Sequence, residues 1–232
     1  MRQAIAISVV IPTLNAAARL AACLDALVGP TVDALVREVI VVDAGSTDAT
    51  RDIADGFGAR VFDASPGRGG QLRLGAETAS STWLLFLHGD TVLSDAWARD
   101  ATAFMETGAP AAVFTLRFDA RGIAPRLVAS GAMLRTRIFK SPYGDQGLLV
   151  SRDAYDDIGG YRDMPLFEDV DIIKRLIKAR GRGAVSVLSA HATTAADRYE
   201  RNGYGRQVLA NMWRVARFNA GVSPEKIAAR YR

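Results

Sequence analysis

The sequence predicts an α/β protein in which helices flank a mostly parallel central sheet. Three observations lead to this class: apolar, β-branched runs recur along the chain, segments with helical periodicity lie between them, and the connections are short. The chain has 232 residues, of which 49% are hydrophobic and 23% are charged. This composition excludes a disordered chain and suits one large domain over residues 1–232, without an internal repeat or linker.

In residues 1–107 the strands are expected to end near Ile11, Val42, Phe62 and Leu87. A helix follows the first strand, and Asn15 is its expected N-cap. The carboxyl ends of parallel strands meet at one edge of a sheet, where ligands gather. The loops expected to open onto that edge are 12–15, 43–48, 65–70 and 88–91. This half should therefore bind the principal ligand.

Residues 108–232 continue the sheet less regularly. Strands are expected at 111–118, 146–152 and 184–189, with a basic amphipathic helix at 123–139 and a helix from 168 that ends at Gly181. A long helical tail follows. We interpret this half as the part that receives a second substrate.

Charge and cysteine content limit the functional classes. The formal net charge of +4 permits an anionic substrate or an acidic membrane surface, but does not indicate nucleic acid. The excess of basic over acidic residues is concentrated in residues 198–232, which contain eight basic and two acidic residues. Cys23 is the only cysteine, which excludes an internal disulfide and a cysteine-rich zinc site and fits the cytoplasm.

Membrane contact, if it occurs, is expected from the surface. The opening "MRQAIAISVVIPT" is short, β-branched and stopped by Pro12, which indicates a first strand and not a signal peptide. No window approaches the roughly 20 apolar residues of a membrane span. The helix around 207–218 sets Leu209, Met212 and Trp213 among arginines. One interpretation is a packed helix with a solvated basic side. The other is a helix that contacts the inner membrane face or a lipid-linked acceptor.

The phosphate-binding motifs narrow the choice further. Neither a G-x-G-x-x-G sequence after the first strand nor a G-x-x-x-x-G-K-[ST] sequence occurs, so dinucleotide and P-loop folds are disfavoured. A divalent cation, Mg²⁺ or Mn²⁺, can neutralise a diphosphate instead, and Asp90 at a strand end is suited to anchor it. The alternative for 88–90 is an ordinary polar turn. "PGRGGQ" at 66–71 is expected to be a flexible loop that delivers Arg68.

Five segments together resemble family 2 glycosyltransferases of the GT-A fold: "SVVIPTLNAAARLAACLDAL", "VIVVDAGSTDAT", "FLHGDT", "YGDQGLLVSR" and "PLFEDVDIIKRL". The resemblance covers roughly residues 7–180. More narrowly, "FLHGDT", "GDQG" and the tail "GVSPEKIAARY" resemble a small bacterial subgroup linked to arsenosugar biosynthesis. The resemblance implies transfer of a sugar, with inversion, from a nucleotide diphosphate sugar such as a UDP-sugar to an unidentified acceptor.

The resemblance also implies which residues bind the donor. The nucleotide-sugar residues would be Pro12, Thr13, Asn15, Asp43, Arg68, His88, Gly89 and Asp90. Ser46 and Asp48 either shape this site or cap a helix. The family's metal motif is usually Asp-X-Asp, and here only Asp90 of His88-Gly89-Asp90 retains a carboxylate. Asp90 remains the expected metal ligand, while His88 is either a ribose or phosphate contact or a histidine satisfied within the fold.

The base in the family is the Asp of a Glu-Asp pair at a helix start, which corresponds to Asp169 beside Glu168. Alternatively, the two acids only complement the helix dipole. Asp145 and Gln146 resemble residues that line the sugar and acceptor pocket, with a Gly-Asp turn as the competing interpretation.

Three further residues are weaker candidates. His191 could complete the metal shell or be structural, and Arg198 and Arg201 could contact the diphosphate or belong to a solvated helix face. Two other functions stay open at this point. One is a sugar-phosphate nucleotidyltransferase, although "IPTLNAAARL" lacks the glycine-, arginine- and lysine-containing loop of that class. The other is a nucleotide-sugar-binding protein without catalysis.

Overall fold

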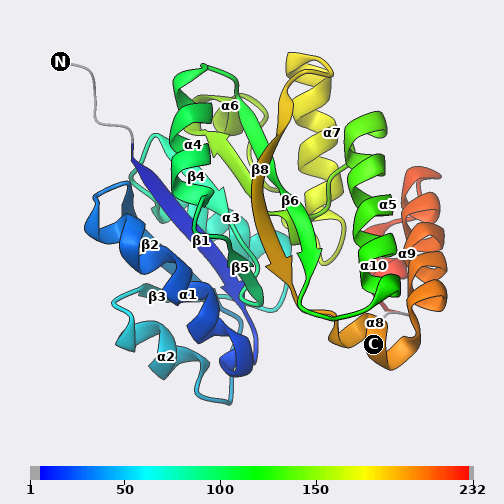
Figure 1. The fold of residues 1–232 in the computed structure, drawn as a ribbon, viewed down its shortest axis with the longest axis horizontal. Helices are drawn as coiled ribbons and strands as arrows, with labels where there is room; N and C mark the ends of the chain where they lie inside the picture. Colours follow the sequence, from blue (N-terminus) through cyan, green and yellow to red (C-terminus); the bar gives the residue numbers. More distant parts are fainter. Residues whose placement is uncertain (1–5, 230–232) are drawn as a thin grey trace.

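Eight strands form one sheet in the computed structural model, which describes residues 6–229 (Figure 1). Their order across the sheet is β3-β2-β1-β4-β7-β6-β8-β5. The strands are β1 Ile7–Thr13, β2 Val36–Asp43, β3 Arg60–Asp63, β4 Trp83–Phe86, β5 Thr91–Leu93, β6 Ala111–Phe118, β7 Leu148–Ser151 and β8 Val185–Thr194. Arg230 and Arg232, which contribute to the basic C-terminal excess, and the first five residues of the opening segment lie outside the described residues.

The predicted parallel character holds for the half of the sheet built from residues 1–107. β3, β2, β1 and β4 are all parallel neighbours. β7 then pairs antiparallel with both β4 and β6, while β6 and β8 are parallel and β5 and β8 are antiparallel. An antiparallel strand in the middle was not expected from the sequence. It brings the residues just before β7 next to the end of β4.

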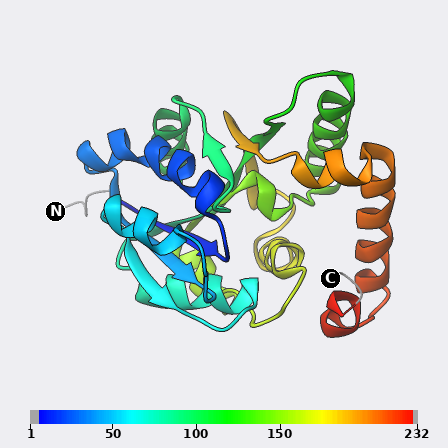
Figure 2. The same ribbon diagram turned by 90° about the horizontal axis from the view of Figure 1, so that it is seen from below.

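Helices cover both faces of the sheet (Figures 1 and 2). They are α1 Ala17–Val32, α2 Thr50–Gly56, α3 Arg68–Thr78, α4 Trp97–Glu106, α5 Ile123–Phe139, α6 Arg152–Asp157, α7 Glu168–Arg180, α8 Asp197–Asn202, α9 Tyr204–Asn219 and α10 Pro224–Ala228, with a 3-10 turn η1 at Gly144–Gln146. Among residues 6–229, no helix is long and apolar enough to cross a membrane.

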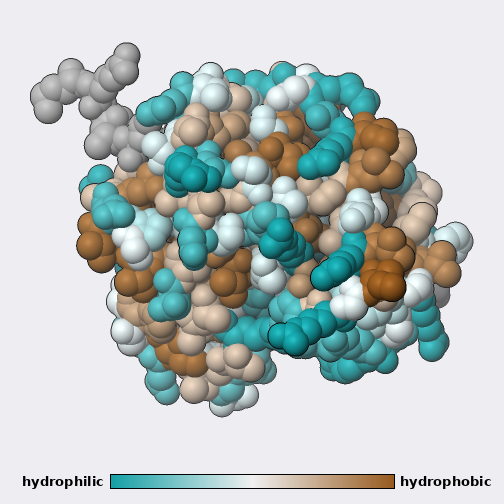
Figure 3. All heavy atoms as spheres, in the orientation of Figure 1, coloured by the Kyte–Doolittle hydropathy of each residue, from teal (hydrophilic) through white to brown (hydrophobic). Residues whose placement is uncertain are grey.

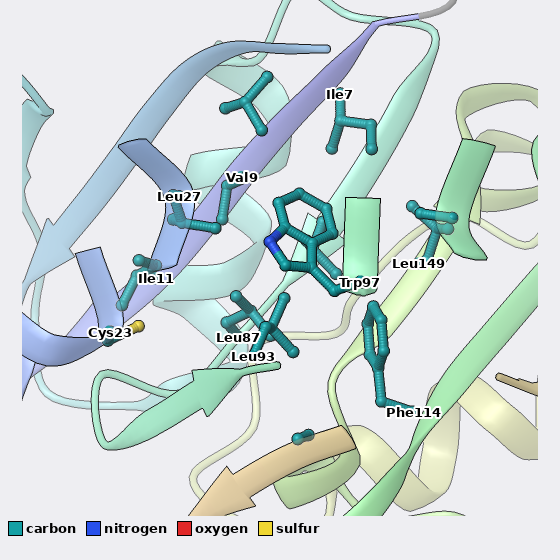
Figure 4. Close-up of a cluster of buried hydrophobic side chains, with 14 of the residues drawn as sticks. Ile7, Val9, Ile11, Cys23, Leu27, Leu87, Leu93, Trp97, Phe114 and Leu149 are labelled. Carbon is teal, nitrogen blue, oxygen red and sulfur yellow. The ribbon is translucent and has the colours of Figure 1, made fainter. Parts of the chain in front are cut away.

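The alternation of side chains along β1 divides the core into two layers. Ile7, Val9 and Ile11 pack toward α1 and α4, where Trp97 lies among Val9, Leu87 and Phe114 (Figure 4). Val10 points the other way, into a second cluster with α3, α6 and α7. The sheet is therefore buried on both faces, which explains why its strands read as continuous apolar runs.

A third, smaller cluster lies at the start of α7. Phe167 and Val170 pack there with Ile227 of α10, and Phe218 of α9 stacks on Phe167 with ring centroids 4.7 Å apart. The C-terminal helices are therefore attached to the helix that carries the predicted catalytic pair.

Two local predictions were wrong. Asn15 does not cap α1: Ala16 is the N-cap, Asn15 has a φ of +51°, and the first backbone N–H groups donate instead to Thr50 Oγ1 and Asp48 Oδ2. The free N–H groups of a helix start need acceptors, and a neighbouring loop supplies them here. Residues 66–71 are not a loop throughout, because α3 already begins at Arg68.

Candidate active site

A cleft of about 690 Å³ opens at the carboxyl ends of the parallel strands. The loops after β1, β2 and β4 and the start of α3 all contribute to it, as the strand order predicts. The cleft residues from the sequence-predicted set are Pro12, Thr13, Asn15, Arg68, His88, Gly89 and Asp90. The C-terminal region closes one side through Ala195, Asp197 and Ala228.

Asp43 lies beneath this cleft and not on its wall. It is fully buried, and its carboxylate accepts hydrogen bonds from the hydroxyls of Thr13 and Ser46 and from the backbone N–H groups of Gly45 and Ser46. Burial raises the pKa of Asp43, but the hydrogen bonds from Ser46, Thr13 and Gly45 outweigh it, so the pKa is lowered. In this structure Asp43 and Ser46 hold the loop after β2 in shape.

Gln71 belongs to this site and was missed by sequence reasoning. Its Nε2 donates to the carbonyl oxygens of Thr13, at 2.9 Å, and Val42, at 2.7 Å. It is 5% exposed and joins α3 to the ends of β1 and β2 under the cleft. Because the sequence predicts a loop at 66–71, no sequence signal indicated this role.

His88 lies where the strand-end cleft meets a second, smaller cavity. Burial lowers its pKa well below the usual value, and the nearby positive charges of Arg68 and Arg198 lower it further. The imidazole is therefore neutral. A Cβ on Gly144 would lie 2.7 Å from His88 Nε2, so glycine is needed there for the histidine to fit.

Asp90 has the properties of a cation ligand. Its Oδ1 accepts long hydrogen bonds, at 3.5 Å, from the hydroxyls of Thr91 and Thr194. Because these contacts are weak, the carboxylate oxygens are available to bind a cation. Residues 6–229 contain no group of three or more His, Cys, Asp or Glu side chains arranged for a metal ion. A single carboxylate suits Mg²⁺ or Mn²⁺, which keep several waters and take further oxygens from substrate phosphates. The residues present therefore fit a cation that is shared with the substrate.

His191 does not join Asp90. It lies three residues before Thr194 in β8, and because side chains alternate along a strand, it points to the opposite side from the Thr194 hydroxyl. Burial and the nearby Arg117 lower the pKa of His191. Its role as a metal ligand is not supported by this arrangement.

The smaller cavity, of about 180 Å³, contains the predicted catalytic pair. Its lining residues are Arg68, His88, Tyr143–Asp145, Leu166–Val170, Asn211, Arg214 and Val215. The cavity lies between α7 and α9, so the C-terminal helices complete it.

Glu168 and Asp169 have different environments within this cavity. Glu168 is 2% exposed, with Oε1 3.5 Å from Arg68 Nη1; burial and the neighbouring Asp169 raise its pKa to about 7. Asp169 is partly exposed and accepts hydrogen bonds from the backbone N–H groups of Gly144 and Val170, both at 2.7 Å. Phe167, directly before the pair, has a left-handed φ of +68°, which is strained for a non-glycine residue.

The two predicted pocket residues beside β7 differ. Asp145 lines the cavity, and burial raises its pKa to about 6; its Oδ1 has no hydrogen-bond partner within the described part of the chain. Gln146 was wrongly assigned to the pocket. It is fully buried beneath it, where Oε1 accepts from Thr136 and Nε2 donates to the Phe114 carbonyl, so it ties α5 to β6.

Neither Arg198 nor Arg201 lines either cavity, but Arg198 lies near Arg68 and Asp90, whose charges act on it. Burial lowers the pKa of Arg198, as do the positive charges of Arg68, Arg201 and Arg214, while Asp90 opposes them. Arg201 is exposed and donates from Nε to the Asp197 carbonyl. Arg68, Arg198 and Arg214 thus make the junction of the two cavities electropositive, as an anionic ligand requires.

The fold and this site indicate a glycosyltransferase. Residues 8–166 match the model of glycosyl transferase family 2, and because this is more than half of the chain, the protein belongs to that family. The predicted family and the GT-A fold class are therefore confirmed. The assignment to the arsenosugar-linked subgroup stays a prediction. The match ends before Phe167, so the Glu168-Asp169 pair and the C-terminal helices lie outside it.

Two named bacterial proteins are similar in sequence to part of this chain. Over 96 residues the chain is 43% identical to a PGL/p-HBAD biosynthesis glycosyltransferase of Mycobacterium bovis, a match that covers 38% of this chain and 37% of that protein. Over 95 residues it is 37% identical to glucosyl-3-phosphoglycerate synthase of Mycobacterium tuberculosis, which covers 37% of this chain and 29% of that one. The chain thus matches only about a third of the length of these relatives.

Solved structures share the fold across most of the chain. The M. tuberculosis glucosyl-3-phosphoglycerate synthase in complex with Mn²⁺, UDP and phosphoglyceric acid has a TM-score of 0.63 at 22% identity, covering 90% of this chain and 78% of that one. S. aureus TarS residues 1–349 have a TM-score of 0.66 at 20% identity, covering 84% and 62% respectively.

Proposed function

We propose that the protein is an inverting glycosyltransferase that moves a sugar from a UDP-sugar, or another nucleotide diphosphate sugar, to a hydroxyl group of an acceptor. The observation that carries this proposal is the connection of two cavities. The strand-end cleft has the size and the polar loops for a nucleotide sugar, and it meets the cavity of Glu168 and Asp169 at Arg68 and His88. Each cavity then holds one substrate.

The two acidic side chains suit different roles. Glu168 is kept protonated toward neutral pH by burial and by Asp169, so it does not compete for the acceptor proton. Asp169, oriented by the N–H groups of Gly144 and Val170, accepts that proton. The acceptor oxygen then forms a bond to the anomeric carbon, and the bond from this carbon to the diphosphate breaks on the opposite face. The resulting charge on the diphosphate is stabilised by Arg68 and Arg198.

We propose Asp90 as the residue that would hold Mn²⁺ or Mg²⁺ together with the donor phosphates. When bound, the cation would neutralise diphosphate charge. Structures of the similar M. tuberculosis glucosyl-3-phosphoglycerate synthase contain Mn²⁺ with UDP, Mg²⁺ with UDP, and Mn²⁺ with UDP-glucose. These likenesses support the proposal by analogy.

The acceptor is a small molecule or the exposed end of a lipid-linked one. The cavity of about 180 Å³ accommodates only a small group, and Tyr143, Asp145, Asn211 and Arg214 offer hydrogen bonds to it. We also propose a cytoplasmic location, because nucleotide sugars are available there.

The incomplete metal motif favours one alternative, a nucleotide-sugar-binding protein without turnover. Calorimetric titration with UDP and GDP, with and without Mn²⁺, combined with a sugar-release assay, separates the two. Asp90→Ala should lose the Mn²⁺-dependent part of binding, and the exposed Asp95→Ala serves as the matched control. Asp169→Asn should bind the nucleotide normally and lose transfer by about 10²- to 10⁴-fold. Full transfer by Asp169→Asn would exclude it as the base; binding without turnover in the wild type would favour the alternative.

A further inference from the structure

The outer side of α5 is apolar although it faces solvent. Ile123, Leu127, Leu134 and Ile138 recur at helical spacing and are 52–76% exposed. The opposite side of the helix, with Pro125, Met133 and Thr136, is buried against the body of the protein. An apolar stripe on the solvent side reverses the usual arrangement of a surface helix and indicates an interaction surface.

α9 has the same arrangement and contacts α5. Leu209, Met212 and Trp213 are 62–68% exposed on its outer side. Its inner side contributes Asn211, Arg214 and Val215 to the cavity of the catalytic pair. One helix thus separates the candidate acceptor site from an exposed apolar surface.

The charge of this surface is uniform. Neither α5 nor α9 contains an Asp or Glu. By helical spacing, Arg126 and Arg137 lie beside the α5 stripe, and Arg206 and Arg217 lie beside Trp213. Figure 3 shows apolar side chains gathered over α5 at this edge of the molecule, with hydrophilic side chains next to them.

We propose that the exposed sides of α5 and α9 form a docking surface for an anionic phospholipid bilayer. Apolar side chains flanked by arginines match the boundary between acyl chains and negatively charged headgroups. A second copy of the chain is a poorer occupant, because a symmetric contact would place the same arginines near one another. The surface goes beyond the proposed function, and its binding to lipid does not depend on the identity of the donor.

Docking in this way would place the wall of the acceptor cavity next to the bilayer. α9 would then have lipid on one side and Asn211 and Arg214 on the other. This arrangement suits an acceptor that is presented from the membrane surface.

Tryptophan fluorescence tests the proposal directly. Trp83 and Trp97 are buried, at 9% and 1% exposed, whereas Trp213 is 68% exposed. Vesicles of phosphatidylglycerol with brominated acyl chains should therefore quench the emission of Trp213 in the full-length protein, whereas brominated phosphatidylcholine vesicles should not. The Trp213→Phe variant should still sediment with phosphatidylglycerol vesicles but show no quenching.

Vesicle sedimentation of variants then measures how much the arginines and the apolar side chains of α5 each contribute to lipid binding. Arg126→Gln combined with Arg137→Gln should weaken binding about 30-fold, because each cation near an anionic surface contributes about fivefold. Leu127→Ser combined with Leu134→Ser should also release the protein. Val32→Ser, at an 80% exposed position on α1, is the matched control and should bind like the wild type. Unchanged UDP binding would show that each variant is folded.

Three results would overturn the proposal. The first is no sedimentation with phosphatidylglycerol vesicles at low salt. The second is equal release by Val32→Ser and by the α5 variants. The third is a stable dimer in light scattering without vesicles in which Trp213 is already shielded from a soluble quencher, since a second copy would then occupy the surface.

Discussion

Replacing Glu168 by Gln should remove a pH-dependent loss of stability. Glu168 is 2% exposed, and burial and the negative charge of Asp169 raise its pKa from 4.5 to about 7. Below pH 4.5 the carboxyl group is protonated in the folded and in the unfolded chain. Between pH 4.5 and 7 the unfolded chain releases this proton while the folded chain keeps it, so the free energy of unfolding falls. Gln carries no proton to release and retains the size and an acceptor oxygen for Arg68.

The size of the effect follows from the shift. Each pH unit between the two pKa values changes the free energy of unfolding by 1.36 kcal/mol, so the interval from 4.5 to about 7 corresponds to about 3 kcal/mol. The stability of Glu168→Gln minus that of the wild type should therefore rise by about 3 kcal/mol from pH 4.5 to 7.5. His88 also titrates abnormally, but it is present in both proteins and its contribution cancels in the difference.

Urea unfolding at pH 4.5, 5.5, 6.5 and 7.5 and constant ionic strength measures this difference. Glu77→Gln is the control, since Glu77 is exposed and pairs only at the surface with Arg73. Its removal should change stability by less than about 0.5 kcal/mol. A difference between Glu168→Gln and the wild type that stays constant with pH would show that Glu168 ionises normally. The assignment of the proton-accepting role to Asp169 alone would then lose its physical basis.

Two other substitutions test how the site is supported. Gln71→Leu removes the side-chain donor to the carbonyl oxygens of Val42 and of Thr13, the second of which still accepts from the Ala44 N–H, and should lower the free energy of unfolding by about 1–3 kcal/mol in urea titrations. A loss well below about 1 kcal/mol would mean that other donors replace it. Phe218→Ala removes the ring that stacks on Phe167 and should lower kcat about tenfold in sugar-transfer assays while the Kd for UDP is unchanged. Equal effects on both constants, or none, would contradict this positioning role.

Much of the fold could be predicted because its signals are local. The helix at 123–139 and the strand at 111–118 have the predicted bounds, and Gly181 ends α7 as expected. Hydrophobic periodicity and capping residues act over a few neighbouring positions, so a single sequence contains them. The order of strands and helices also predicted which loops would meet around the strand-end cleft.

The directions of side chains could not be predicted in this way. Asp145 and Gln146 are adjacent, yet Asp145 lines the cavity of Asp169 while Gln146 is buried against Thr136 and Phe114. Asp43 has the expected position at the end of β2, but its oxygens accept hydrogen bonds from Thr13 of β1 and from the loop that follows. Such outcomes depend on which distant groups complete a hydrogen-bond network.

The sequence by itself determined the family, the succession of strands and helices and the carboxylates at their ends, because these depend on residue type and short-range spacing. Only the tertiary structure decided that β7 runs antiparallel beside β4, that His191 points away from Asp90, and that α9 closes the cavity of Asp169. Each of these features joins segments about 40 to 100 residues apart in the sequence. Long-range packing selects one register and one side-chain direction from several that the local sequence permits.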